Sequence, residues 1–206
     1  MNELDCPELV PLEATVKVER IYGGRHPITC VLGVLGNEEG MRIRDEMLGW
    51  ICDMYDLITV TQAAPGLLYE YPAIRFAQWY SMEYEVPVLY LHTKGAANPV
   101  PIQCAVRNMW RDEFVVHYMW YRDRAVSADA FVGCPLTDGK STWFNGWMAN
   151  PAAFGRIDTI AVSDNRYQYE NDLWDSGKGV RVSGRLLEDA CFDSFDEAWG
   201  IVGKFL

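Results

Sequence analysis

A cluster of residues that can bind an anion stands at the end of an apolar, strand-like segment of the chain. The segment is Val86 to Leu91, and it is followed directly by His92, Thr93, Lys94 and Gly95. A lysine beside a glycine suits a diphosphate, because the ammonium offsets negative charge and the bare backbone allows close approach. The imidazole and the hydroxyl add hydrogen-bonding groups. We therefore predict a diphosphate site here; the alternative is an ordinary turn, with Lys94 in solvent and His92 capping the strand.

A second polar turn is expected at the same edge of the fold. The almost continuously apolar run from Ile28 to Asn37 is typical of a strand buried on both faces, and it ends at Gly36. Asn37 can cap a helix whose first turn carries two glutamates. Ligands of open α/β sheets bind outside the carboxyl ends of the strands, so Gly36 and Asn37 are predicted to bind a ligand beside the HTKG segment.

Several carboxylates are grouped among aromatic residues further along the chain. The segment RYQYENDLWDS contains Glu170, Asp172 and Asp175 next to large apolar side chains. Carboxylates beside aromatic rings can have raised pKa values and act as general bases. The equally acceptable alternative is a solvated helix face, with Tyr169 and Leu173 turned inward as an i,i+4 pair.

The elements that must position these residues alternate along the chain. Apolar, β-branched runs predict strands at residues 28–37, 57–64, 86–95 and 125–136. Helical spacing and capping signals predict helices after residue 37, at 73–85, at 101–121, near 151 and after 194–197. Strands that alternate with helices form right-handed crossovers. The fold class predicted is therefore α/β, an open, mostly parallel sheet with helices on both faces.

The longest of these helices, residues 101–121, has a regular pattern of large side chains. The pattern repeats every three or four residues, and its members are Val106, Trp110, Phe114, His117 and Tyr121. Pro101 suits the first turn of a helix, because its missing N–H is not needed there. One long helix with these residues on one face is therefore predicted.

Length and charge limit the classes of function. The 206 residues suit a single domain over 1–206, with an N-terminal extension at 1–27, a core at 28–175 and a closing segment at 176–206. A net charge of −11 without a basic run argues against nucleic acid and anionic membranes as partners. No apolar run approaches the roughly 20 residues that span a bilayer, so no transmembrane segment is expected. The acidic first residues lack a secretory signal pattern, and the six scattered cysteines suit a reduced compartment, so a cytoplasmic protein is expected.

With these residues in view, the chain resembles glycosyltransferases of the GT-A type, in particular bacterial and viral glycosyltransferase-like proteins that carry a YLHTKG segment. That segment is Tyr90 to Gly95 in this chain. Further pieces of the resemblance follow in the family's order, and they are the Trp110-Arg111 pair, Asp129 to Gly133, Phe144 to Asn150, and Arg166 with Glu170 and Trp174. Phe114 and His117 stand where relatives have tyrosines.

The resemblance implies the nucleotide-diphospho-sugar transferase fold, a Rossmann-like arrangement. It places the nucleotide near the first strand, at Gly36 and Asn37, and the sugar diphosphate at the HTKG segment. Asn145, Gly146 and Trp147 are expected to face the donor sugar or the acceptor. Glu170 or Asp172 is expected to take the acceptor's proton, if the enzyme is inverting.

The chain departs from the resemblance where GT-A enzymes commonly carry Asp-x-Asp to hold a divalent cation. Here His92, Thr93 and Lys94 stand in that place, so the oxygen ligands of a hard cation are missing and no metal or other cofactor is expected. Lys94 is predicted to offset the diphosphate directly and to stabilise the leaving group. The function expected is transfer of a sugar from a nucleotide-diphosphate donor to a glycan in polysaccharide biosynthesis. The alternative is a non-catalytic protein that binds a nucleotide sugar or a glycan.

Overall fold

The computed structural model describes residues 16–21, 27–63, 70–127, 131–133, 136–137, 141–142, 146–157, 160, 182–183, 200 and 202–206. Seven strands form one sheet in the order β1-β3-β2-β4-β8-β5-β9, and β6 and β7 form a separate hairpin-like pair. The strands of the large sheet are β1 (Val16–Ile21), β2 (Thr29–Leu35), β3 (Asp56–Gln62), β4 (Val88–His92), β5 (Phe131–Gly133), β8 (Trp147–Ala149) and β9 (Val182–Ser183). The small pair consists of β6 (Leu136–Thr137) and β7 (Ser141–Thr142).

The sheet is mixed, although most of its strands share one direction. β2 is parallel to both β3 and β4, and β5 is parallel to β9. β1 is antiparallel to β3 at one edge, and β8 lies antiparallel between β4 and β5. β2, β3, β4, β5 and β9 therefore run one way, and β1 and β8 run the other. The predicted α/β class is confirmed, but half of the neighbouring pairs are antiparallel.

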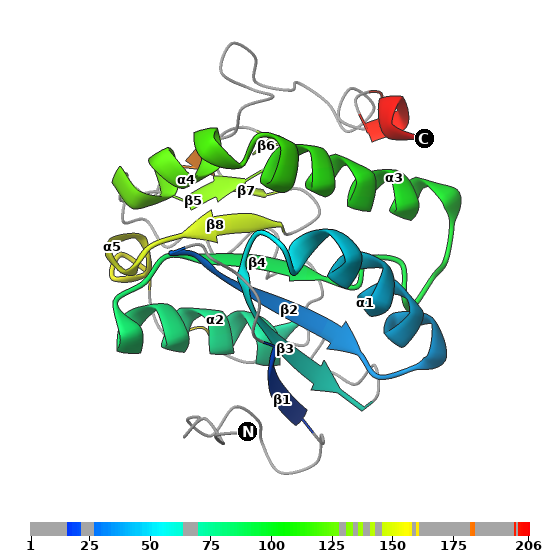
Figure 1. Cartoon of the computed structure of the whole chain (residues 1–206), viewed down its shortest axis with the longest axis horizontal. Helices are drawn as coiled ribbons and strands as arrows, with labels where there is room; N and C mark the ends of the chain where they lie inside the picture. Colours follow the sequence, from blue (N-terminus) through cyan, green and yellow to red (C-terminus); the bar gives the residue numbers. More distant parts are fainter. Residues whose placement is uncertain are drawn as a thin grey trace.

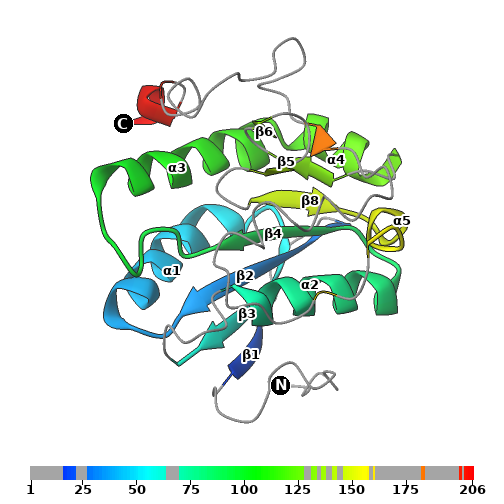
Figure 2. The same ribbon diagram turned by 180° about the vertical axis from the view of Figure 1, so that it is seen from behind.

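Helices cover both faces of the sheet, which gives three layers (Figures 1 and 2). Figure 1 looks from the side of α1 (Glu38–Ile51), and Figure 2 looks from the side of α2 (Tyr71–Tyr84). The other helices are α3 (Pro101–Arg111), the π-helix η1 (Asp112–Val116), α4 (Tyr118–Ser127), α5 (Pro151–Phe154) and the short η4 (Gly203–Phe205). None of the helices in the described residues is long and apolar enough to span a membrane.

The central strands are apolar on both sides because each side packs against a helical layer. Along β2, Leu32 belongs to the core under α1 and α3, while its neighbour Val31 belongs to the core under α2 and α5. β4 alternates in the same way, with Leu91 on the first side and Tyr90 on the second. Both faces of these strands are thus removed from water, as their continuous apolar runs predict.

The turn from β2 into α1 is as the sequence predicts. Asn37 is the N-cap, and its side-chain oxygen accepts a hydrogen bond of 2.7 Å from the N–H of Gly40. Gly40 is required because a β-carbon there would lie 1.9 Å from the carbonyl oxygen of Leu35. The first turn of α1 therefore packs directly on the end of β2.

Two segments differ from the sequence-based expectation. β1 forms within the predicted N-terminal extension and adds an edge strand to the sheet. The strand predicted at 125–136 is wrong at its start, because residues 125–127 still belong to α4 and β5 covers only three residues. The predicted closing-helix signal at 194–197 lies outside the described residues.

The predicted long helix is interrupted by the π-helix η1. A π-turn holds one residue more than an α-turn, so the side chains beyond it move round by one position. Tyr118 is buried, whereas His117, which was predicted on the inner face, is 38% exposed. The hydroxyl of Tyr55 donates a hydrogen bond to the carbonyl oxygen of Phe114, inside the π-turn.

Candidate functional site

A pocket of about 250 Å³ opens where β2 and β4 end, on the side of the sheet covered by α2. Its floor and one wall come from the sheet and the start of α2, and the residues are Gly33, Val34, Leu35, Val60, Gln62, Glu70, Pro72, Ala73 and Tyr90. The other wall is the segment after β4 with one residue of α3, and consists of His92 to Asn98 and Gln103. The carboxyl-end edge predicted from the sequence therefore carries a cavity.

Gly33 makes room for this cavity. It forms the last pair of the β2–β4 ladder, opposite His92, and it lies against Ala73 of α2. A β-carbon at Gly33 would lie 2.9 Å from the β-carbon of Ala73 and 3.5 Å from the hydroxyl oxygen of Tyr90. Any side chain here would have to push α2 away or project into the pocket.

The segment after β4 is tied to the end of β2 by several hydrogen bonds. The backbone N–H of Thr93 donates to the carbonyl oxygen of Gly33 (2.9 Å), and the Leu35 N–H donates to Thr93 Oγ1 (3.1 Å). Asn37 Nδ2 donates to the carbonyl oxygen of Ala96 (3.0 Å). The hydroxyl of Thr93 is thus used inside the protein, and the loop is held from both of its ends.

Lys94 is buried, with 8% of its surface exposed, and it lines the pocket. Folded proteins bury an ammonium group only where charge or hydrogen bonds compensate for the lost water. The interpretation of Lys94 as a solvent-exposed turn residue is therefore wrong. Gly95, the next residue, has a φ of +97°. Residues with a β-carbon rarely adopt this conformation.

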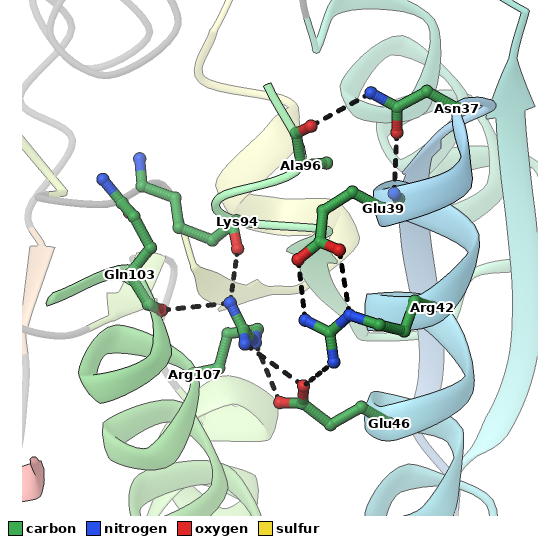
Figure 3. Close-up of polar contacts among 9 residues, drawn as sticks. Asn37, Glu39, Arg42, Glu46, Lys94, Ala96, Gln103 and Arg107 are labelled. Atoms are coloured by element: carbon green, nitrogen blue, oxygen red, sulfur yellow. Dashed lines mark hydrogen bonds and ion pairs between the residues drawn. The ribbon is translucent and has the colours of Figure 1, made fainter. Parts of the chain in front are cut away.

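Arg107 of α3 holds the backbone of this turn (Figure 3). Its Nη1 donates to the carbonyl oxygens of Lys94 (2.7 Å) and Gln103 (3.3 Å). Its Nε and Nη2 donate to the two carboxylate oxygens of Glu46 in α1, at 2.9 and 3.1 Å. A bidentate arginine and carboxylate pair of this kind has a fixed geometry. Lys94 is therefore positioned by a pair of residues from two helices.

The same network continues along α1. Arg42 donates to both oxygens of Glu39, at 2.9 and 2.7 Å, and approaches Glu46 at 3.5 Å. The hydrogen bonds from Arg42 lower the pKa of the Glu39 carboxyl, so that the group stays ionised. These contacts align Glu46 toward Arg107.

A histidine from one wall of the pocket and a carboxylate from the other lie close together. His92 Nε2 is 3.2 Å from Glu70 Oε1, and the imidazole packs against the indole of Trp110 at 5.2 Å between ring centres. His92 is 7% exposed, whereas the Glu70 side chain keeps 25% of its surface exposed. The pocket therefore offers one ammonium, one carboxylate and one imidazole within a single cavity.

Glu70 is a site residue that the sequence did not identify. It occupies the N-cap position of α2, directly before Tyr71 and Pro72. A proline marks the first turn of a helix, and this helix begins at the carboxyl edge of the sheet. Together these signals would have placed residue 70 at the pocket.

The other predicted donor-binding residues lie beside the pocket and not in its lining. The Gly36 N–H donates to the carbonyl oxygen of Gln62 at 2.8 Å, and Asn37 is occupied with the N-cap and with Ala96. Asn37 therefore supports the loop that lines the cavity, and Gly36 ties the end of β2 to the end of β3. The structure thus brings His92, Thr93, Lys94 and Gly95 into the pocket and keeps Gly36 and Asn37 behind it.

The predicted sugar or acceptor residues are only partly described. Trp147 is fully buried in β8, and its ring packs against Tyr90 at 5.0 Å between ring centres. Its side chain is therefore in the core and not in the pocket lining. Gly146 directly precedes β8, and because Tyr90 is paired with Trp147, it lies at the end of β4. Asn145, Glu170 and Asp172 lie outside the described residues.

The chemistry of the pocket suits a ligand with a negative charge and hydrogen-bonding groups. Pockets for small molecules usually hold about 300 to 1,000 Å³, so this cavity matches part of a nucleotide sugar better than a whole one. In the described residues, no group of three or more histidine, cysteine, aspartate or glutamate side chains is placed to hold a metal ion. Comparisons of the chain with protein-family models, with curated proteins and with solved structures gave no match.

Proposed function

We propose that this chain is a GT-A-like glycosyltransferase that moves a sugar from a nucleotide-diphosphate donor to a hydroxyl of a glycan or polysaccharide. The observation that carries the proposal is the buried Lys94, which lines a pocket at the carboxyl edge of the sheet beside His92 and Gly95. An ammonium in that position is suited to the two phosphates of such a donor. The YLHTKG resemblance supplies the reaction class.

In the proposed reaction, an acceptor hydroxyl forms a bond to the anomeric carbon, and the bond from that carbon to the diphosphate oxygen breaks. The electron pair leaves with the nucleoside diphosphate, where negative charge builds up. Lys94 stabilises that charge, as a metal ion does in other enzymes. The acceptor proton passes to a carboxylate, and Glu170 and Asp172 are the candidates from the sequence. Glu70 is a third candidate, because it lines the pocket.

The first test is a thermal-shift panel with UDP-, GDP-, CDP- and dTDP-sugars, each with and without manganese. We expect at least one donor to raise the melting temperature in the absence of manganese, because Lys94 offsets the diphosphate by itself. A shift that strictly requires manganese would contradict the role given to Lys94. A panel without any shift would remove support for the whole proposal.

The second test is the variant Lys94→Ala, assayed for sugar transfer or slow donor hydrolysis. Loss of one group that stabilises developing charge costs about 10² to 10³ in turnover. The matched control is Lys17→Ala on β1, because the Lys17 side chain is 67% exposed, pairs with Glu19 and does not line the pocket. Near-normal turnover of a folded Lys94→Ala protein would refute the assignment.

The second candidate function is binding of a nucleotide sugar without turnover. The observation in its favour is that the carboxylate described at the pocket, Glu70, is already paired with His92 at 3.2 Å. A carboxylate that is already in contact with an imidazole is less accessible to the hydroxyl of an acceptor. Donor hydrolysis in the absence of acceptor separates the two functions, because a transferase turns over its donor slowly and a binding protein does not.

A further inference from the structure

We infer that the Lys94–Gly95 turn is the phosphate-binding element of the pocket, and that Arg107 is the positioning residue that keeps it in its binding conformation. A phosphate oxygen would accept hydrogen bonds from the Gly95 N–H and the Lys94 ammonium together. The inference rests on the proposed function for the identity of the phosphate. It adds a backbone donor and a supporting ion pair that the sequence did not reveal.

The peptide between Lys94 and Gly95 has a defined direction. The described residues contain no cis peptide bond, so the N–H of Gly95 points opposite to the carbonyl of Lys94. That carbonyl is directed at Arg107 by a hydrogen bond of 2.7 Å. The Gly95 N–H therefore points away from Arg107. In Figure 3 the side chains of Lys94 and Gln103, both of which line the pocket, also extend away from the Arg107 guanidinium.

The backbone N–H groups on either side of Gly95 already have acceptors. The N–H of Lys94 donates to His92 (2.7 Å), and the N–H of Ala96 donates to Thr93 (3.0 Å). Within the described part of the chain, the Gly95 N–H has no hydrogen-bond partner. Backbone N–H groups in turns where one residue has a positive φ form concave sites for anions. Gly95, with its φ of +97°, supplies such a donor next to an ammonium.

Arg107 supports the turn rigidly. Arg107 is 5% exposed, and all three of its nitrogens that donate hydrogen bonds have partners in Glu46, Lys94 or Gln103. The planar guanidinium fixes these partners relative to one another, which an ammonium cannot do. Glu46 compensates for the charge of Arg107. The role of Arg107 is therefore to orient the Lys94–Gly95 peptide.

The experiment measures the affinity of inorganic pyrophosphate by calorimetry for the native chain and for Arg107→Lys. Lysine keeps the positive charge but loses the bidentate geometry, so we expect pyrophosphate to bind at least tenfold more weakly. Arg122→Lys is the matched control, because Arg122 of α4 pairs with the neighbouring Asp123 away from the pocket. Lys94→Ala should also weaken binding at least tenfold.

A second ligand separates positioning from general damage to the loop. UDP, GDP, CDP and dTDP are titrated beside their nucleosides, which lack phosphate. For the nucleoside diphosphate that binds, Arg107→Lys should lower the affinity at least tenfold. The affinity of the corresponding nucleoside should change by less than twofold. Equal losses for both would overturn the inference, since they would mean that the pocket as a whole had collapsed. If Arg107→Lys fails to fold, Glu46→Gln is used, with the same direction expected.

The outcomes also distinguish this inference from the proposed function. If nucleotide sugars bind and Arg107→Lys changes nothing, the inference is wrong and the function stands. If pyrophosphate binds in an Arg107-dependent way and no nucleotide sugar binds, the phosphate site stands and the function is wrong. If pyrophosphate, free phosphate and nucleotides all fail to bind, both are wrong.

Discussion

Two glycines of α1 have opposite surroundings. Gly40 packs on the end of β2, where a β-carbon would come within 1.9 Å of the Leu35 carbonyl oxygen. Gly49 is exposed, and a β-carbon there would meet no atom within 4 Å. Glycine inside a helix costs about 0.5 to 1 kcal/mol relative to alanine, because of its greater freedom in the unfolded chain. The same substitution should therefore have opposite effects at the two positions.

We expect Gly49→Ala to raise the free energy of unfolding by about 0.5 to 1 kcal/mol. Gly40→Ala should lower it by about 1 to 3 kcal/mol, because α1 must move away from β2. Urea denaturation followed by circular dichroism measures both. A stabilising Gly40→Ala would show that α1 is not seated on the strand end as described.

At this scale, the sequence predicts residues that depend on a local pattern and misses those that depend on distant partners. Lys94 was found because it follows a strand. Arg107 was missed because its role comes from Glu46, which is 61 residues away in the chain. Asn37 was placed correctly as an N-cap, yet its contact with Ala96 could not be foreseen for the same reason.

At the scale of elements, η1 explains an error in the predicted helix face. Regular spacing assumes about 3.6 residues per turn, and the π-turn breaks this period between Phe114 and Tyr118. Tyr118 takes the inward position and stacks edge-on against Tyr55 at 5.4 Å between ring centres. No local signal distinguishes this turn in the sequence, because its stabilising hydroxyl comes from Tyr55.

The hydroxyl of Tyr55 should contribute measurably to the free energy of unfolding. Tyr55→Phe leaves the carbonyl of Phe114 buried without that donor, so we expect a loss of about 1 to 3 kcal/mol in the free energy of unfolding. The control is Tyr84→Phe, because Tyr84 is 47% exposed. Equal stability of the Tyr55→Phe variant would show that the hydrogen bond contributes nothing to folding.

Burial also raises the pKa of Tyr55 far above its usual value. Below about pH 10 this tyrosine is protonated in both the folded and the unfolded chain, so its contribution to stability is fully present. Above that pH the unfolded chain loses the proton and the folded chain keeps it. Stability should then fall by up to about 1.4 kcal/mol per pH unit for this group. Denaturation midpoints between pH 9 and 11 should fall less steeply for Tyr55→Phe than for the native chain.

At the scale of the whole molecule, two cores share the same strands and should unfold together. Leu32 and Val31 are adjacent in β2 and fully buried on opposite sides of the sheet. Leu32→Ala should cost about 2 to 5 kcal/mol, and Val31→Ala should cost less because fewer atoms are removed. Tryptophan fluorescence and circular dichroism should report one shared urea transition, shifted by either variant.

Separate transitions by the two probes, or a variant that shifts only one probe, would contradict a single folding unit. The control is Val126→Ala on α4, whose side chain is 58% exposed and should leave the midpoint within the error of the measurement.

The alternation of strands and helices could be predicted, because it depends on apolar runs and on the periodic spacing of apolar residues that are close in the sequence. The antiparallel insertion of β8 between β4 and β5 was not, since strand order depends on contacts between distant segments. β1 was missed for a related reason, because its residues are only partly buried at the sheet edge and its apolar signal is weak. The site at the ends of β2 and β4 could be predicted because those two strands are parallel neighbours in the sheet, so that their carboxyl ends lie at the same edge.

The π-turn η1 has a consequence for the tolerance of the chain to deletion. A π-turn holds one residue more than an α-turn. A helix with one residue fewer between Arg111 and His117 would present the same buried rings, Trp110 and Tyr121, to the core. Removal of one residue inside η1 should therefore leave an unbroken helix in its place, with the flanking helices in their present packing.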